Sequence, residues 1–309
     1  FTVMSCDNVR ENGHVAKVAV LGLAQARDPQ LAAWIEENVT FPCTMVDRIV
    51  PAATPETLQE IADQLGVYDP CAIACEPFRQ WVIEDNFVNG RPDWDKVGAQ
   101  FVADVVPFEM MKLRMLNGSH SFLAYLGYLT GYAHINECME DAAFREAARR
   151  LMLEEQAPTL RIKDVDLTAY ADSLIARFAN PALQHRTWQI AMDGSQKLPQ
   201  RMLDGIRIHL ERNTDWPLLA LGVAGWIRYV SGTDERGNAI DVRDPLSDKI
   251  RAIVGASRDA DRVNALLGLS EVFGHDLPQN SVFVEAVSEA YARITRHGAR
   301  QAVIETLNI

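Results

Sequence analysis

The sequence predicts an α/β region followed by a mostly α-helical domain. Strand-like runs alternate with helical periodicity up to the turn Asn89-Gly90-Arg91-Pro92, and after this turn the strand-like runs almost vanish. From Pro107 onward the pattern is helical nearly throughout. Because 309 residues are enough for two domains, we assign residues 1–106 to the first domain and 107–309 to the second.

The first predicted strand spans residues 1–6, an apolar run that ends at Asp7-Asn8. Open α/β sheets place their ligands beyond the carboxyl ends of strands, so these polar residues indicate a ligand-binding edge. Because the chain begins without Met and inside this run, we expect that an N-terminal part is absent. The prediction is therefore an α/β remnant of a dinucleotide-binding (Rossmann-type) domain followed by a mostly α-helical C-terminal domain.

The other elements follow from periodicity, caps and turns. One helix is predicted to begin with Thr54 as N-cap and Pro55 at its first helical position, and to end near Gly66. Further elements of the first domain are helices at 15–26 and 29–38 and strands at 44–50, 72–75 and 79–83. In the second domain, helices are expected at 108–129, 142–154, 167–178, 199–211, 217–229, 260–267 and 281–297, and the stretch 231–244 is expected to be irregular.

The charge of the chain argues against two classes of partner. A formal net charge of −12 is unfavourable for binding nucleic acid, because phosphate binding relies on clustered Lys and Arg, and it also repels anionic membranes. The sequence has no signal peptide and no apolar run long enough to span a bilayer. We expect a cytoplasmic protein with a small-molecule substrate, no nucleic-acid partner and no membrane partner.

The cysteines predict neither a disulfide framework nor a metal site. There are five, without framework spacing, which is typical of a reducing cytoplasm. Cys71 and Cys75 lie in the apolar run CAIAC, so we expect them to be buried on a strand as small hydrophobic residues. No CxxC, HExxH or His/Cys cluster is present, and we therefore predict no metal.

One helical segment carries the residues that chemistry would need. At 100° per residue, Lys112, Asn117 and His120 lie on one broad face of the predicted helix. Oxidation of a secondary alcohol needs a base for the hydroxyl proton and donors for the developing alkoxide, and a partly buried lysine and asparagine amides meet these needs. On spacing alone, however, a solvated lysine, a structural histidine and an Asn-Gly turn are the more common interpretation.

Three motifs in order resemble those of one family. They are Ser5-Cys6-Asp7-Asn8, the phrase FPCTMVDRIVP at residues 41–51, and the segment Lys112 to His120. Together they resemble the polyol-specific long-chain dehydrogenases of the mannitol dehydrogenase family, and the resemblance extends to the C-terminus. It implies an NAD-dependent, metal-independent oxidoreductase of carbohydrate metabolism that acts on a polyol or sugar acid, and we expect a monomer.

The resemblance also implies roles for individual residues. Lys112 matches the general acid/base of the family, and Asn8 and Asn117 match the two amides that hold the oxyanion. His120 matches a substrate-contacting histidine, and Glu109 matches a glutamate that gates proton movement to solvent.

Further roles concern the cofactor and the substrate. Asp47 matches an acidic residue beside the nicotinamide and the substrate, so Asp47 and Asn8 are predicted to contact NAD. Arg48, which follows in the VDRI phrase, and Lys197, for which the family has a lysine, are predicted to contact substrate. The family's glycine-rich phosphate loop has no counterpart here, because GxGxxG occurs nowhere in the 309 residues. We therefore expect this chain by itself to be inactive and to bind NAD weakly.

Within the family, residues 115–126 and 192–201 are most similar to the members that interconvert D-mannonate and D-fructuronate with NAD. Mannitol dehydrogenases carry a substrate-binding arginine where Gln189 stands here. We hypothesise that one or more of Arg186, Lys197 and Arg201 pairs with the carboxylate of a sugar acid instead. For Arg186, a surface charge without function is an equal alternative.

Two alternatives to this substrate remain open. The chain could belong to a mannitol 2-dehydrogenase or to another uronate reductase, such as one for tagaturonate, because pocket shape decides between these substrates. From a different class, it could be a non-catalytic helical domain for binding or assembly.

Overall fold

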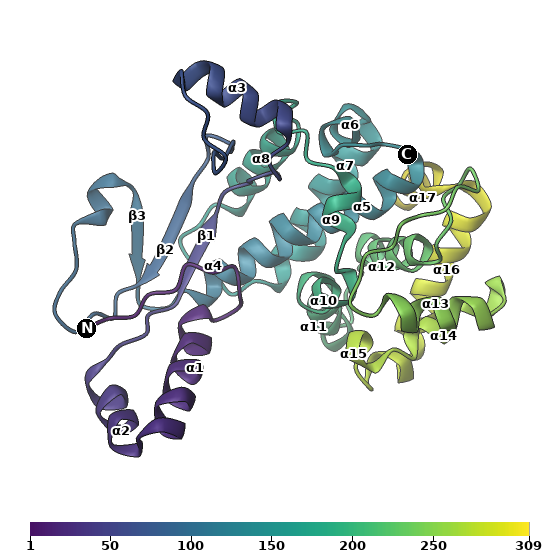
Figure 1. Cartoon of the computed structure of the whole chain (residues 1–309). Coiled ribbons are helices and arrows are strands. Elements are labelled where there is room, and N and C mark those ends of the chain that lie inside the picture. The colour runs from purple at the N-terminus through teal and green to yellow at the C-terminus, as the bar shows by residue number, and fades with distance from the viewer. Residues whose placement is uncertain (309) are drawn as a thin grey trace. The chain divides into compact units, whose positions relative to one another are not determined.

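A computed structural model describes residues 1–308, apart from the side chain of Ala260. The chain divides into two compact units, Phe1–Lys112 and Leu113–Ile309. Ile309, the last residue of the predicted second domain, lies outside the described residues. The first unit contains the sheet and the second is helical, as the fold class predicted (Figure 1). The predicted boundary after residue 106 remains a prediction.

The first unit is built on a three-stranded sheet in the order β1-β2-β3, with β1 at Thr44–Asp47, β2 at Gln80–Glu84 and β3 at Ala99–Val102. β1 runs antiparallel to β2, and β2 runs parallel to β3. Met45 pairs with Val82 in the sheet, and both side chains join Cys43 and Val105 in a buried cluster. This cluster anchors the segment that ends at Asp47.

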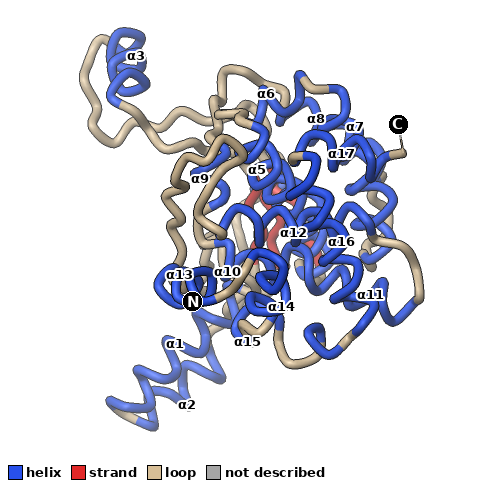
Figure 2. The backbone as a smooth tube through the Cα atoms, turned by 90° about the vertical axis from the view of Figure 1, so that its right-hand side faces the viewer, coloured by secondary structure: helices blue, strands red, loops and turns tan. Residues whose placement is uncertain are grey.

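The predicted helices of the first unit are confirmed. α1 (Asn12–Arg27) and α2 (Pro29–Asn38) lie side by side (Figures 1 and 2). α3 (Pro55–Leu65) begins as predicted, because the Thr54 hydroxyl accepts a hydrogen bond from the Thr57 N–H and caps the helix. It ends at Gly66, whose φ of 71° suits glycine. α4 (Val106–Met111) is the last helix of this unit.

Two strand predictions are wrong. Residues 1–6 form only an isolated bridge between Thr2 and Thr40, because side chains rather than a strand partner take the Ser5 carbonyl. Residues 72–75 form no strand, because Asp69 accepts hydrogen bonds from the backbone that follows it and so forms a turn. Its side chain accepts the Cys71 N–H, and its carbonyl accepts the Ala72 N–H.

Two further differences concern the same part of the chain. Cys71 and Cys75 are exposed, so the prediction that they are buried is also wrong. Strand β3 was not predicted, since it has only four residues and follows a short 3-10 helix, Trp94–Val97. Pairing with β2 supplies what the local sequence does not.

The second unit consists of helices. In chain order they are α5 Ser119–Thr130, α6 Ile135–Glu140, α7 Ala142–Arg150, α8 Leu167–Phe178, α9 Thr187–Ala191, α10 Gly194–Leu198, α11 Asp204–Arg212, α12 Pro217–Val230, α13 Ser247–Ala256, α14 Arg262–Leu267, α15 Ser270–Phe273, α16 Ser281–His297 and α17 Ala299–Leu307. All seven predicted helices are found: those at 167–178 and 281–297 have the predicted bounds, the other five have shifted ends, and the one predicted at 108–129 begins in α4 of the first unit. Residues 231–244 are irregular as expected. α6, α9, α10, α13, α15 and α17 were not predicted.

The core of the second unit surrounds α12. This helix is buried along almost its whole length and packs against α5, α16 and α17 (Figure 2). Trp226 of α12 lies edge-on to Phe273, and Phe273 contacts Phe283. Such dense packing gives the unit a rigid frame for polar groups.

Within residues 1–308, three π-helical segments interrupt the helices: η2 at Lys112–Gly118, η3 at Leu151–Gln156 and η5 at Pro199–Leu203. Such segments are frequent at functional sites, because they change which side chains share a helix face. The 100° spacing used in the prediction therefore does not hold between Lys112 and Asn117.

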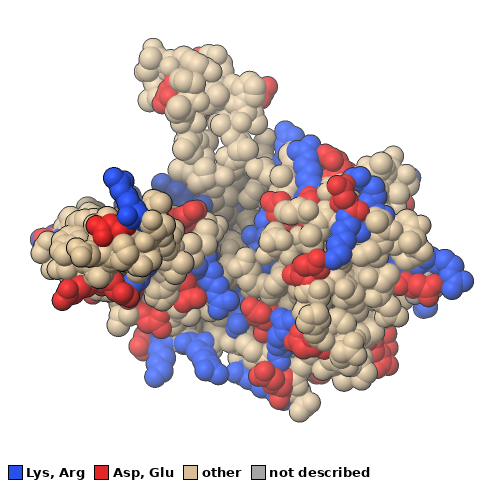
Figure 3. All heavy atoms as spheres, turned by 60° about the horizontal axis from the view of Figure 1, so that its bottom comes forward, with Lys and Arg blue, Asp and Glu red and all other residues tan. Residues whose placement is uncertain are grey.

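The surface mixes both signs of charge. On the face seen in Figure 3, Lys and Arg alternate with Asp and Glu, and neither sign forms a continuous patch. Within residues 1–308, every helix falls short of the length and apolarity that crossing a membrane would require. In the same residues, no three His, Cys, Asp or Glu side chains gather in a way that could hold a metal ion.

Candidate active site

Lys112 is the buried amine of the first unit. Its side chain is 8% exposed, and its Nζ donates hydrogen bonds to Asn8 Oδ1 at 2.8 Å and to the Val46 carbonyl at 2.5 Å. Asn8 and Lys112 are 104 positions apart in the chain, yet they share one hydrogen bond. Two of the predicted catalytic residues are thus brought together.

A buried asparagine that the sequence analysis missed holds this arrangement. Asn12 is 2% exposed, and its Nδ2 lies within 3.1 Å of the carbonyls of Ser5, Asp7 and Thr44. Its Oδ1 accepts the Thr44 N–H at 2.9 Å. The segment before Asn8 is therefore tied to β1. The pair Asn12-Gly13 resembles a turn in sequence, so the only signal was its short distance from Asn8.

Glu109 lies three residues before Lys112 and is 8% exposed. Its Oε1 accepts the Glu11 N–H at 2.9 Å. Burial raises the pKa of Glu109, although the hydrogen bond from Glu11 and the charge of Arg10 oppose that change. A carboxyl group that gains a proton more readily than usual thus lies near the amine.

Asp47 ends strand β1 and is 3% exposed. Arg48, which follows it, is exposed, and its guanidinium donates to the carbonyls of Glu76 and Pro77 at 2.8 and 3.5 Å. The Glu76 carboxylate in turn accepts the Ile49 N–H. Arg48 thus braces the strand end. A pocket of about 270 Å³ beside Asp47 and Arg48 is lined by further residues of this unit, including Trp81 and Trp94.

In the second unit, His120 is 5% exposed and lies in an aromatic setting. Its ring stacks on Phe178 with centroids 4.4 Å apart and meets the His185 ring edge-on at 5.1 Å. Burial, and then the charges of His185, Arg201 and other cations, lower the pKa of His120 well below its usual range. His120 is therefore a neutral ring that can donate or accept a hydrogen bond.

Asn117 and Lys197 are also held by backbone contacts. The carbonyl of Asn117, which is 8% exposed, accepts Arg201 Nη1 at 3.3 Å. A Cβ on Gly118 would lie 2.8 Å from the Arg201 carbonyl, so glycine permits this close approach. Lys197 Nζ donates to the carbonyls of Met192 at 2.6 Å and Ile190 at 3.3 Å. Burial, assisted by Arg201, lowers the pKa of Lys197 to about 8.

Arg186 is exposed and directly precedes α9. His185, Ser121 and Tyr125 are further residues of this unit to which the sequence assigned no role. His185 meets His120, Ser121 accepts a hydrogen bond from Arg201, and Tyr125 is fully buried. The signal for Ser121 was its place one residue after His120.

The histidine pair predicts acid sensitivity. Burial lowers the pKa of His185 to about 4, so between pH 6.5 and 4 the unfolded chain binds a proton that the folded chain does not. The contribution of His185 to the free energy of unfolding is therefore most favourable above pH 6.5. It falls by about 3 kcal/mol in total as the pH decreases through the unfolded and then the folded pKa. Urea unfolding from pH 7 to 4.5 should show a shallower pH dependence for His185→Gln. Equal slopes for both proteins would contradict the prediction.

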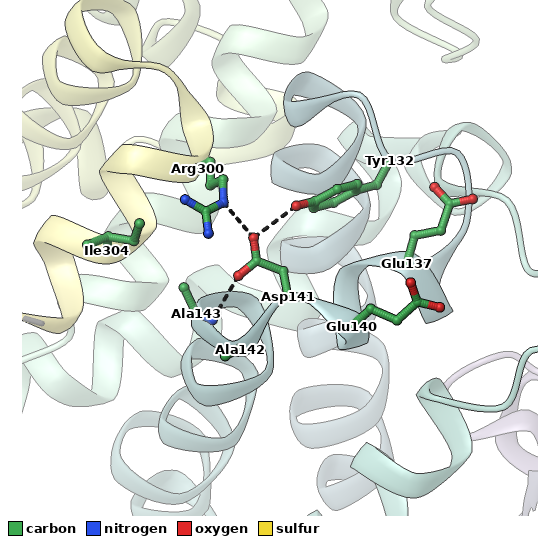
Figure 4. A pocket seen from close by; sticks show the side chains of 8 residues that line it. All are labelled: Tyr132, Glu137, Glu140, Asp141, Ala142, Ala143, Arg300 and Ile304. Carbon is green, nitrogen blue, oxygen red and sulfur yellow. Dashed lines mark hydrogen bonds and ion pairs between the residues drawn. The ribbon is translucent and has the colours of Figure 1, made fainter.

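A pocket of the second unit lies at Asp141 (Figure 4). It has a volume of about 800 Å³, and the Asp141 carboxylate there accepts hydrogen bonds from Arg300, Tyr132 and the Ala143 N–H. These contacts cap α7 and join it to α17. The predicted site residues are absent from its lining.

Comparison with known proteins gives consistent matches. Residues 1–96 match the mannitol dehydrogenase Rossmann domain, and residues 104–295 match the mannitol dehydrogenase C-terminal domain. The chain is 75% identical to the D-mannonate oxidoreductase of Escherichia coli over 304 residues, which cover 98% of the chain and 63% of that protein. It is 71% identical over 309 residues to the uncharacterized oxidoreductase YeiQ of the same organism, covering 100% of the chain and 63% of that protein.

A solved structure agrees with these matches. The mannitol 2-dehydrogenase of Pseudomonas fluorescens, in a ternary complex with NAD and D-mannitol, matches with a TM-score of 0.89 and 38% identity. The match covers 100% of this chain and 62% of that one. The chain therefore spans less than two thirds of the length of these relatives.

Proposed function

The chain belongs to the mannitol dehydrogenase family, and on this premise we propose that the protein containing it interconverts D-mannonate and D-fructuronate by hydride transfer with NAD. This is the activity of fructuronate reductase, also called D-mannonate oxidoreductase. The observation that carries the proposal is the buried Lys112 amine bonded to Asn8. Among the relatives, a D-mannonate oxidoreductase is 75% identical to the chain.

Lys112 is proposed as the general acid/base. During oxidation of D-mannonate, the neutral amine accepts the hydroxyl proton while the hydride leaves the carbon that bears this hydroxyl. During reduction of D-fructuronate, the ammonium returns the proton to that oxygen. Two acceptors, Asn8 Oδ1 and the Val46 carbonyl, fix the position of Nζ.

Asn8 is proposed to serve the oxyanion. Because its Oδ1 accepts from Lys112, the amide group is oriented, and its Nδ2 is left as the donor. An amide N–H stabilises the developing alkoxide by a hydrogen bond without giving up its proton to that oxygen. Asn117 is proposed as the second amide.

Glu109 is proposed to pass the proton onward. It lies one turn before Lys112, and burial raises its pKa, so this carboxyl group takes up a proton more readily than an exposed glutamate does. Its hydrogen bond to Glu11 fixes one carboxylate oxygen and leaves the other for this exchange.

NAD is proposed as the cofactor, since a related enzyme was solved with NAD. Asp47 and Asn8 are the residues of this chain proposed to lie beside the nicotinamide, because Asp47 closes β1 and Asn8 is held next to the same strand through Lys112. When bound, NAD supplies the hydride acceptor.

The substrate contacts are also proposals. His120 is suited to a substrate hydroxyl, because its ring stays neutral. Lys197 is suited to an oxygen-rich substrate, and Arg48 and Arg186 remain predictions of substrate contact. The protein is further proposed to be a cytoplasmic monomer without a nucleic-acid partner.

A substrate panel tests the proposed function. The full-length protein should oxidise D-mannonate with NAD at a kcat/KM at least about tenfold above that for D-mannitol, because the two differ by a carboxylate that a matched cation recognises. Reduction of D-fructuronate and D-tagaturonate with NADH should be measured in parallel. A preference for D-mannitol or D-tagaturonate would favour the alternative dehydrogenases, and inactivity throughout would favour a non-catalytic domain.

A further inference from the structure

Two cations lie in the second unit without a carboxylate partner. Lys197 donates only to backbone carbonyls, and Arg201 donates only to the Asn117 carbonyl and the Ser121 hydroxyl, within the residues that the structure describes. Buried cations are normally paired with anions, since desolvation of an isolated charge is costly. Asp193 and Asp244 act on Lys197 through their charges, but among residues 1–308 no carboxylate is bonded to Arg201, which therefore lacks the counter-charge that a ligand would bring.

The guanidinium of Arg201 is held by one of its nitrogens. Nη1 donates to Ser121 Oγ at 3.0 Å and to the Asn117 carbonyl at 3.3 Å. Nε is buried and has no acceptor among residues 1–308. A buried donor without a partner destabilises the fold, and a ligand that accepts its hydrogen bond would remove this cost.

The unused edge of the Arg201 guanidinium is complementary in shape to a carboxylate. Nε and Nη2 of a guanidinium point in parallel, which is the fork that binds both oxygens of a carboxylate. Because Nη1 is anchored, this edge of Arg201 has a fixed direction. Preorganisation of this kind reduces the conformational entropy that the protein loses when a ligand binds.

The surroundings favour an anion over a neutral group. Arg201 and Lys197 each depress the protonation of His120, and Arg201 depresses that of Lys197, so their positive potentials overlap. Burial also lowers the pKa of Arg201 to about 10. A bound carboxylate would reverse these effects by supplying the missing counter-charge.

We propose that the Nε–Nη2 edge of Arg201 binds the carboxylate of the sugar acid, and that Arg201 thereby determines the preference for acids over neutral polyols. This inference rests on the proposed function, since it names the group that recognises the substrate class. Arg201 stands one helical turn after Lys197, and it supplies a guanidinium to a chain that has glutamine at position 189.

The main alternative is that Arg201 only positions Asn117 and Ser121. In that case the loss of Arg201 would lower kcat/KM equally for acids and for neutral polyols, because both substrates would depend on the same displaced Asn117 and Ser121. A carboxylate-binding role instead affects the acid alone. The ratio between an acid and a neutral substrate therefore separates the two roles.

The test uses Arg201→Gln and Arg201→Lys in the full-length protein. We expect Arg201→Gln to lower kcat/KM for D-mannonate about 100-fold, mainly through KM, and to change kcat/KM for D-mannitol less than about threefold. Arg201→Lys keeps the charge but not the fork, so it should recover part of the loss. Dissociation constants of both sugars with NADH bound give the same ratio where turnover is slow.

Two control variants separate anchoring from recognition. Ser121→Ala removes one hydrogen-bond partner of Arg201 but keeps the guanidinium. It should lower kcat/KM for D-mannonate much less than Arg201→Gln does. Arg207→Gln removes an arginine of the next helix, α11, that is paired with Asp276. It should change kcat/KM for neither substrate. Circular dichroism and melting temperature verify folding in each case.

The outcomes distinguish the inference from the function on which it rests. An equal loss on both sugars, or no loss on either, would overturn the role of Arg201 while D-mannonate oxidation still stands. Wild-type preference for a different sugar acid, with a selective loss in Arg201→Gln, would overturn the proposed substrate and support the carboxylate contact. Wild-type preference for neutral polyols would overturn both.

Discussion

Replacing Lys112 with methionine is expected to lower kcat/KM for D-mannonate by about 10³-fold, because the variant has no group to accept the hydroxyl proton. Methionine keeps the length and the burial of the side chain, while the hydrogen bonds to Asn8 and Val46 are lost. The rate should be measured with the full-length protein from pH 6 to 10. The loss should persist across this range, because the variant has no group at this position that can accept the proton.

The control for Lys112 is an exposed lysine of the same unit. Lys96 is 73% exposed and pairs with Asp93, so Lys96→Met should leave kcat/KM unchanged. Added small primary amines should restore part of the activity of Lys112→Met, because they supply the missing base. Activity within threefold of the wild type would rule out Lys112 as the acid/base.

Glu155→Ala is expected to destabilise the second unit by about 3–5 kcal/mol. Glu155 is 4% exposed, and its two carboxylate oxygens accept the N–H groups of Leu218 and Leu219 at 2.8 and 2.7 Å. These are among the unpaired N–H groups at the start of α12, around which the unit packs. Alanine would leave both donors buried without acceptors and would open a cavity.

The measurement for Glu155 is urea unfolding followed by circular dichroism. Glu154→Ala is the matched control, since Glu154 is the exposed neighbour that pairs with Arg150 and should cost less than about 0.5 kcal/mol. Burial raises the pKa of Glu155 to about 8, so Glu155→Gln, which keeps one acceptor oxygen and no charge, should lose less than the alanine variant. Equal stabilities for Glu155→Ala and Glu154→Ala would contradict the capping role.

Helices with local end signals could be predicted from the sequence. The predicted helices at 167–178 and 281–297 have the bounds of α8 and α16. In both cases the cap is a neighbour in sequence: Asp166 accepts the N–H groups of Thr168 and Ala169, and Asn280 accepts the Phe283 N–H. Such signals are local, so they need no knowledge of the fold.

Elements that depend on distant partners could not be predicted in this way. Residues 1–6 have the composition of a strand, but Asn12 and Thr44 bind the Ser5 carbonyl in its place. Strand β3 exists through its pairing with β2. Both outcomes depend on contacts across long separations, to which composition and periodicity are insensitive.

By itself, the sequence determined the identity of the chemical groups: an amine at Lys112, amides at Asn8 and Asn117, a ring at His120 and an acidic net charge. The tertiary structure decided their state. Burial keeps His120 neutral, and Asn8 and the Val46 carbonyl accept hydrogen bonds from Lys112. Asn12 ties the segment before Asn8 to β1, and Arg201 Nε has no acceptor among residues 1–308. The reason is physical, because solvation and hydrogen-bond partners arise from the packing of distant segments, whereas the kind of side chain is encoded residue by residue.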